Sequence, residues 1–137
     1  MIGLKIIFTD IDGVLNPHWR KSWSKNSISI FNRICRDFNL KPVITSTWRT
    51  NHTINQLQDI FTEQGIEIEI YDYTPVLEQT ERGLEIKQWL SNNHCDNYVV
   101  VDDKVSDIEQ HVSNVVKCQS WVGLTEESYN DIKEILK

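Results

Sequence analysis

The chain has 137 residues, of which 39% are hydrophobic and 25% charged, and its formal net charge is −6. This length and composition predict one ordinary globular domain over residues 1–137, and no apolar run is long enough to span a membrane. The acidic excess argues against strong nonspecific binding to nucleic acid but stays compatible with a local basic rim around one site. The N-terminus lacks the layout of a signal peptide, so a cytoplasmic location is expected.

The first predicted element is a buried strand that ends at an aspartate. Its residues at 6–8 are β-branched or aromatic, Asp10 follows at the tip, and Asp12 comes two residues later. Two carboxylates so close repel each other, so a cation between them is expected. From these residues alone, the alternative is a strand followed by an ordinary Asp-Gly turn.

Helical and strand-like patterns alternate along the rest of the chain. Apolar residues at helical spacing predict helices over 27–38, 53–64, 83–92 and 125–136. Short apolar runs predict strands over 43–46, 66–71, 97–101 and 114–117. Ser27 or a neighbouring polar residue is expected to cap the first helix, and Gly65 to end the second. No capping box is expected between Thr125 and Ser128.

This alternation predicts an α/β fold of three layers (α/β/α), Rossmann-like, with a mainly parallel central sheet. The gaps between the strand ends are too short to hold a separate cap domain. Three predicted strands end in residues that suit phosphate or a metal ion, namely Asp10, Ser46 and the pair Asp102 and Asp103. The carboxyl ends of parallel strands share one edge of a sheet, so these residues are expected to converge there.

The converging residues predict chemistry at a phosphate. Four carboxylates in one crevice need a counter-ion, and oxygen ligands without His or Cys favour Mg²⁺ over Zn²⁺. The Ser46 hydroxyl and the backbone amides after it, at Thr47 and beyond, suit phosphate oxygens, and Arg82 or Lys87 supplies positive charge. One aspartate as nucleophile and a second as acid and base would complete a hydrolytic cycle.

The segment Asp10-Ile11-Asp12-Gly13-Val14-Leu15 resembles motif I of the haloacid dehalogenase-like (HAD) phosphohydrolases. Residues 43–46 resemble motif II, and 99–103 with Asp107 resemble motif IV. The segments 46–49, 82–90 and 123–127 look like a small, cap-less branch of that superfamily. The resemblance covers nearly the whole chain and implies a three-layer HAD fold.

The resemblance also implies roles for individual residues. Asp10 matches the nucleophile and a Mg²⁺ ligand, and Asp12 the general acid/base, which binds the metal through its backbone carbonyl. Asp102 matches a direct metal ligand, and Asp103 an outer one. Ser46 matches the phosphate-binding hydroxyl. Thr45 is the less favoured candidate, because neighbouring residues of a strand point to opposite faces.

Two features leave alternatives open. The family expects a basic residue at the start of the helix before motif IV, which favours Arg82 over Lys87. The loop at 16–26 lies where HAD proteins place a flap, and its residues could form a substrate rim together with a residue after the second strand. The candidate rim residues are His18, Trp19, Arg20, Trp23 and Arg49. The alternatives are a solvated basic loop with a packed Trp, and an Arg49 that anchors its own loop by an ion pair.

The sequence therefore predicts a Mg²⁺-dependent phosphatase that works through a phosphorylated Asp10. Its substrate is a phosphorylated small molecule or a nucleic-acid end, and an open site leaves room for a partner protein as a lid. The alternatives are a polynucleotide phosphatase of repair, and a non-catalytic domain that binds phosphate or a partner.

Overall fold

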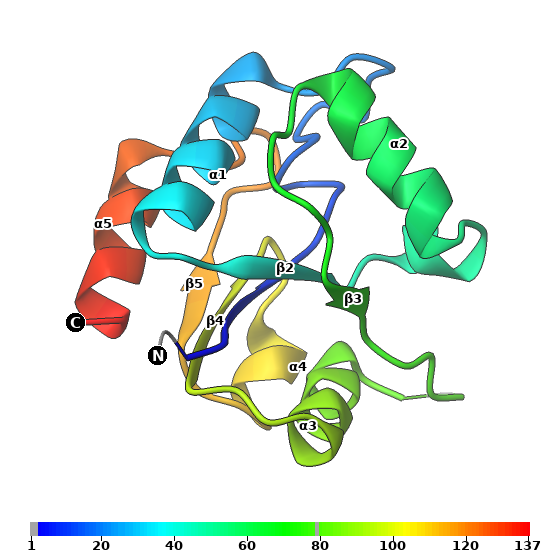
Figure 1. The fold of residues 1–137 in the computed structure, drawn as a ribbon, viewed down its shortest axis with the longest axis vertical. Helices are drawn as coiled ribbons and strands as arrows, with labels where there is room; N and C mark the ends of the chain where they lie inside the picture. The colour runs from blue at the N-terminus through cyan, green and yellow to red at the C-terminus, as the bar shows by residue number, and fades with distance from the viewer. Residues whose placement is uncertain (1–2, 79) are drawn as a thin grey trace.

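The sheet is built around β1 (Lys5–Thr9), whose neighbours are β2 (Lys41–Ile44) on one side and β4 (Asn97–Asp102) on the other. In this computed structural model, which describes residues 3–78 and 80–137, two edge strands complete the sheet, β3 (Asp72–Tyr73) and β5 (Val115–Lys117). All five strands are parallel, in the order β3-β2-β1-β4-β5 (Figure 1). The predicted α/β fold with a parallel central sheet is confirmed, and the described residues contain no additional cap domain.

Helices follow the strands as the alternation predicts. The four long ones are α1 (Lys25–Asp37), α2 (Ile54–Gln64), α3 (Arg82–Asn92) and α5 (Glu126–Ile135). Two short elements were not predicted, the 3₁₀ helix η1 (Thr47–Thr50) after β2 and α4 (Ser106–Glu109) after β4. None of the helices in the described segments is both long and apolar enough to cross a membrane.

The helix ends show where the predicted boundaries were right and wrong. Gly65 ends α2 with φ 98°, a left-handed conformation that a residue without Cβ adopts easily. Ser24, and not Ser27, caps α1, and its hydroxyl accepts from the N–H of Ser27. The expectation of no capping box at α5 is wrong: the Thr125 hydroxyl accepts from the Ser128 N–H, and the Ser128 hydroxyl accepts from the Thr125 N–H.

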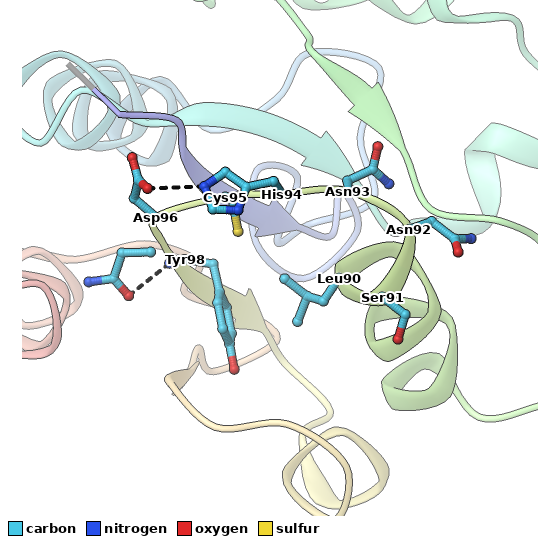
Figure 2. Close-up of a pocket in the computed structure, with 9 residues that line it drawn as sticks. Leu90, Ser91, Asn92, Asn93, His94, Cys95, Asp96 and Tyr98 are labelled. Atoms are coloured by element: carbon cyan, nitrogen blue, oxygen red, sulfur yellow. Dashed lines mark hydrogen bonds and ion pairs between the residues drawn. The ribbon is translucent and has the colours of Figure 1, made fainter. Parts of the chain in front are cut away.

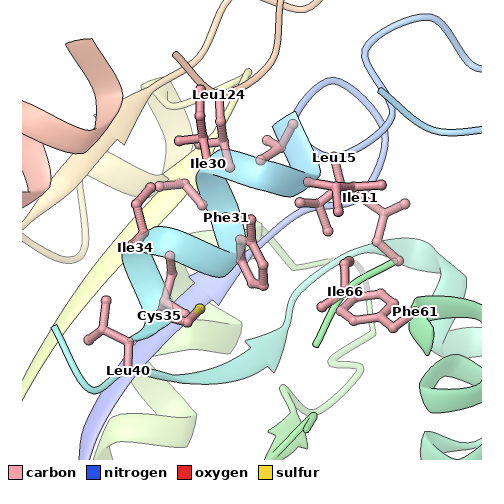
Figure 3. Packing of buried hydrophobic residues seen from close by; sticks show 14 of the residues in the cluster. Ile11, Leu15, Ile30, Phe31, Ile34, Cys35, Leu40, Phe61, Ile66 and Leu124 are labelled. Atoms are coloured by element: carbon pink, nitrogen blue, oxygen red, sulfur yellow. The ribbon is translucent and has the colours of Figure 1, made fainter. Parts of the chain in front are cut away.

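The alternation of side chains along the strands creates two hydrophobic clusters. Ile7 and Val99 pack with α1, α2 and α5 on one face, and Ile6 and Val100 pack with α3 and α4 on the other. Figure 3 shows the first cluster, where Phe31 of α1 points toward Ile66 and Phe61, and Ile34 lies on the other side of the helix. These buried clusters hold the two helical layers against the sheet, and so fix the strand ends that carry the polar residues.

The predicted strand over 66–71 is wrong, although its apolar residues Ile66 and Ile70 are buried as the alternation indicates. Two backbone N–H groups in this segment donate to side chains, Glu67 to Asn32 Oδ1 and Ile70 to Gln58 Oε1. These groups therefore do not join a strand ladder, and pairing with β2 as a strand begins only at Asp72.

Candidate active site

Three carboxylates meet at the carboxyl edge of the sheet. Asp10 follows β1, Asp102 is the last residue of β4, and Asp103 comes directly after it. All three are buried, and each offers an oxygen that lies within 4.8 Å of those of the other two. From β1 the strand order runs through β2 to β3 on one side, and the chain then returns to place β4 and β5 on the other side of β1. Open parallel sheets bind ligands at such a reversal of strand order.

Each carboxylate is oriented by a hydrogen bond from its own surroundings. Asp10 Oδ1 accepts from the Ile11 N–H at 2.8 Å, and Asp103 Oδ2 accepts from the Ser120 hydroxyl at 2.8 Å. Gly13, in the turn after Asp12, has φ 85°, and a Cβ there would collide with the Asp103 carboxylate. The turn at Gly13 therefore packs directly against the carboxylate of Asp103, which comes from the second half of the chain. The turn thus forms part of the site and does not only connect two elements.

Arg82 is the cation at this cluster. It is the first residue of α3, and its Nη1 lies 3.0 Å from Asp10 Oδ2 and 2.8 Å from Asp102 Oδ2. The Arg82 backbone N–H donates to Asp107 Oδ2 at 3.2 Å, which fixes the helix start against the segment after β4. Lys87 is exposed more than one turn further along α3. The structure thus brings Arg82, and not Lys87, to the carboxylates.

The electrostatics of the cluster fit a divalent cation. Burial raises the pKa of Asp102 to about 7, with Asp10 adding to the rise and Arg82 opposing it. Burial likewise raises the pKa of Asp10, again against Arg82. Three buried carboxylates with one guanidinium leave negative charge uncompensated, and an all-oxygen ligand set is the one that hard cations such as Mg²⁺ prefer. The residues present therefore suit a hard metal ion.

Asp12 lies apart from the three clustered carboxylates. Its side chain is partly exposed, and Oδ2 accepts from the indole N–H of Trp48 at 3.1 Å. Asp12 lines a cavity of about 370 Å³ together with Thr47, Trp48, Asn51 and His52. This carboxylate therefore faces open space beside the cluster, where a group exchanging protons with substrate or water belongs.

The two hydroxyl residues after β2 have different surroundings. The Ser46 hydroxyl caps η1 and accepts from the Trp48 N–H at 3.2 Å. The Thr45 hydroxyl is buried and has no hydrogen-bond partner among the described residues. Since Thr45 N–H donates to Thr9 O, Thr45 continues the ladder in the row of Asp10, on the face of the sheet that α3 covers.

Thr47 separates two openings. It lines the cavity of Asp12 and also a second cavity, of about 330 Å³, whose lining includes Arg82 and Asp107. A ligand bound beside Thr47 would therefore be close to both cavities, the one that Asp12 lines and the one that Arg82 lines.

The structure separates the five candidate rim residues. His18, Trp19 and Arg20 are exposed on the loop after β1. Trp23 is 4% exposed and packs edge-on against Trp48 and Phe61, with 5.6 Å between ring centroids in each pair. Its ring belongs to the core and is not brought to the rim.

Arg49 is also buried, and it anchors the turn after β2. Its guanidinium donates to the carbonyl oxygens of Thr45, Ser46, Thr74 and Pro75 and forms a 2.7 Å ion pair with Glu85. These bonds occupy its donors, so Arg49 holds the segments that surround Thr47, while its side chain also borders the cavity of Arg82. The alternative that Arg49 anchors its own loop by an ion pair is confirmed.

Two residues next to the site were missed by the sequence reasoning. Ser120, which donates to Asp103, and the exposed Trp121 lie in the turn after β5. Their position after the predicted fifth strand could have indicated them, because a fifth parallel strand must also end at the edge where the other strands end.

A larger cavity, of about 570 Å³, lies away from this cluster. It is lined by the continuous segment 90–98, which links α3 to β4 at the amino end of the sheet (Figure 2). His94 and Asp96 pair with each other there at 3.3 Å, and no residue of the carboxylate cluster takes part. Although this cavity is larger, the candidate active site is therefore placed at the carboxyl edge of the sheet, where the carboxylates and Arg82 lie.

The family model of the HAD domain in Swiss Army Knife RNA repair proteins matches residues 6–129. The chain belongs to this family. The predicted membership of the HAD superfamily is thereby confirmed. No curated protein matches the chain significantly. In this HAD domain, the matched region contains the three clustered carboxylates, Asp12, Arg82 and both Thr45 and Ser46.

Proposed function

We propose that this HAD domain is a Mg²⁺-dependent phosphatase that works through an aspartyl phosphate on Asp10. The observation that carries the proposal is the position of Asp10. It is buried at the end of the central strand, it shares a metal-sized cluster with Asp102 and Asp103, and it is paired with Arg82. A nucleophile that lies beside a guanidinium and beside a set of carboxylates that suits a metal ion is placed for attack on a dianionic phosphate.

The substrate phosphate is proposed to lie at the mouth of the cluster, beside Thr47. Arg82 binds its oxygens as a fork of donors, and the free hydroxyl of Thr45 donates to one of them. The backbone N–H of Thr47 contributes a further donor. Ser46 shapes this turn, and its hydroxyl, which still has a proton to give, is the alternative phosphate contact.

The proposed reaction has two halves. In the first, an oxygen of Asp10 attacks phosphorus, the bond between phosphorus and the ester oxygen breaks, and Asp12 gives its proton to the leaving oxygen. In the second, Asp12 takes a proton from water, the water oxygen attacks phosphorus, and the bond to Asp10 breaks. Inorganic phosphate and free Asp10 result.

Asp10, Asp102 and Asp103, with the backbone carbonyl of Asp12, would hold Mg²⁺. When bound, the ion supplies positive charge that lets the phosphate approach these carboxylates and stabilises the transition state. Asp107 holds the start of α3 and so steadies Arg82 beside this ligand set.

The favoured substrate is the phosphate at the end of an RNA strand. The support is the family, which is described from RNA repair proteins, and the openness of a site that no cap domain encloses within residues 3–78 and 80–137. A phosphorylated small molecule is the alternative substrate, and a partner protein remains the proposed lid for either.

The test is release of inorganic phosphate in the presence of Mg²⁺ from three substrate groups. These are RNA oligonucleotides with a 3′- or 5′-phosphate, mononucleotides, and small aliphatic phosphoesters. We expect oligonucleotides to give the highest kcat/KM and chelation by EDTA to abolish turnover. Asp10→Asn should abolish turnover without unfolding the protein, whereas Asp96→Asn at the opposite end of the sheet should not.

Two results would contradict the proposal. Turnover retained in Asp10→Asn would exclude the aspartyl phosphate. Binding of Mg²⁺ and phosphate without release from any substrate would favour the non-catalytic alternative.

A further inference from the structure

Two tryptophans are exposed side by side next to the candidate active site. Trp19 is 51% exposed and Trp121 is 66% exposed, and their rings meet edge to face with 5.1 Å between centroids. They come from segments far apart in the sequence, the loop after β1 and the turn after β5. Exposed apolar residues that adjoin one another form a patch, and such patches commonly mark binding sites, whereas single exposed residues do not.

The loop of Trp19 is built onto the loop that carries Asp12. The buried amide of Asn16 donates to the Arg20 carbonyl at 2.9 Å and accepts from the Arg20 N–H at 3.1 Å. This pair of bonds closes a short loop in which Trp19 has φ 49°. A bulky side chain in the left-handed region is strained, and such strain persists where the surroundings fix it, commonly at functional sites.

The turn of Trp121 is fixed to the same site from the other side. Ser120 donates to Asp103, and the Gly123 N–H closes the turn on the Gln119 carbonyl at 2.9 Å. Gly123 has φ 77°, and a Cβ there would press on the Val14 carbonyl of the loop after β1. The two tryptophans are thus presented by two segments that contact each other and the carboxylate cluster.

The surroundings of the pair define the ligand. The ring of His18 lies near Trp121 in a tilted arrangement, with 6.3 Å between ring centroids, and Arg20 and Lys21 are exposed beside Trp19. A concentration of cationic groups on a chain of net charge −6 points to an anionic ligand, and exposed indoles point to one with flat rings. An unpaired, phosphate-linked nucleobase has both properties.

We infer that Trp19 and Trp121 form a stacking platform for an unpaired base of a single-stranded RNA end. The platform holds the base while the terminal phosphate enters the carboxylate cluster, and Arg20 and Lys21 contact the backbone. This inference rests on the proposed function for the choice of RNA. It adds that the strand must be unpaired, because a base inside a duplex cannot offer its face to the indoles.

The test is the affinity for a fluorescein-labelled single-stranded RNA of mixed sequence with free hydroxyl ends, measured by anisotropy with EDTA present. Trp19→Ala and Trp121→Ala should each weaken binding by about 5- to 150-fold, which is the range for loss of one stacked base. Trp19→Phe and Trp121→Phe should stay within about threefold of the parent, since phenylalanine also stacks. Tyr71→Ala is the matched control, because Tyr71 is an exposed aromatic residue whose N–H bonds to Pro42 at the amino end of β2.

Unchanged affinity in both alanine variants would overturn the platform, as would equal affinity for the same RNA as a blunt duplex. An equal loss in Tyr71→Ala would do so too, because it would indicate an effect that is not local. Because the assay needs no hydrolysis, its outcome is independent of the phosphatase test.

Discussion

The indole N–H of Trp48 donates a hydrogen bond to Oδ2 of Asp12 across 3.1 Å. Trp48 is in turn fixed between the buried Trp23 on one side and His52, whose ring it stacks with at 5.4 Å, on the other. The partly exposed carboxylate of Asp12 is therefore held in one orientation by a side chain packed against the core. This arrangement makes Trp48 a positioning residue for the proposed acid and base.

Trp48→Phe tests this role. The variant keeps an aromatic ring and loses the donor, and a typical side-chain hydrogen bond contributes about 0.5–1.5 kcal/mol, so kcat should fall by roughly 2- to 10-fold. The measurement is kcat in the parent, Trp48→Phe, Asp12→Asn and the double variant. If Trp48 acts through Asp12, the double variant should be no slower than Asp12→Asn alone. Multiplicative losses would show that Trp48 acts by another route.

Thr45→Val separates phosphate binding from stability. Valine has the shape of threonine and removes a buried hydroxyl without a partner among the described residues, so the free energy of unfolding should stay equal or rise by about 1 kcal/mol. If the hydroxyl binds phosphate, kcat/KM should fall by about tenfold or more in the same variant. Urea unfolding and phosphate release measure the two effects.

Ser46→Ala is the matched comparison. It removes the cap of η1, so it should lower the free energy of unfolding by about 1 kcal/mol and change kcat/KM less than Thr45→Val does. A larger loss of kcat/KM in Ser46→Ala would return the phosphate contact to Ser46.

Strand-end reasoning was sufficient to bring Asp10, Asp102 and Asp103 together, because the carboxyl ends of parallel strands lie at one edge whatever the details. It favoured Ser46 over Thr45 as the phosphate contact, and that choice stays a prediction. The two do point to opposite faces, but the choice depends on which face α3 covers and on the register of Thr9 with Ile44. Neither the covered face nor the strand register can be predicted from the residues near Thr45 and Ser46.

Burial of polar side chains was harder to predict than burial of apolar ones. Arg49 and Trp23 had the residue types of a substrate rim, and the sequence could only offer their structural roles as alternatives. The structure shows those alternatives: Arg49 anchors its loop by an ion pair with Glu85, and Trp23 packs in an aromatic cluster. The segment 66–71 had the alternation of a strand, but side chains of Asn32 and Gln58 accept from two of its N–H groups. These outcomes depend on contacts between residues far apart in the sequence.

The ion pair between Arg49 and Glu85 predicts a large loss of stability on mutation. Both side chains are nearly fully buried, at 3% and 9% exposed, so Glu85→Ala leaves an uncompensated buried guanidinium. Loss of one partner of a buried pair typically costs about 3–5 kcal/mol, and urea unfolding should show a decrease of that size. Glu126→Ala is the control, because it breaks an exposed pair with Arg33 and should change the unfolding free energy little. Similar effects of the two variants would contradict the anchoring role of Arg49.

The raised pKa of Asp102 predicts how stability depends on pH in the metal-free protein. Burial raises that pKa to about 7, whereas an aspartate in an unfolded chain titrates near about 3.9. The folded protein thus keeps a proton that the unfolded chain has lost, so this group stabilises the fold below pH about 4, and the contribution is lost as pH rises to about 7. The measurement is the unfolding free energy with EDTA at pH 5, 6, 7 and 8, taken as the difference between the parent and Asp102→Asn. As pH rises, the unfolding free energy of the parent should fall relative to that of Asp102→Asn. Mg²⁺ should raise the unfolding free energy of the parent more at pH 8 than at pH 5, because at pH 5 the ion must displace the proton on Asp102. A difference that favours the parent increasingly towards pH 8 without metal would show that Arg82 already compensates Asp102 in full.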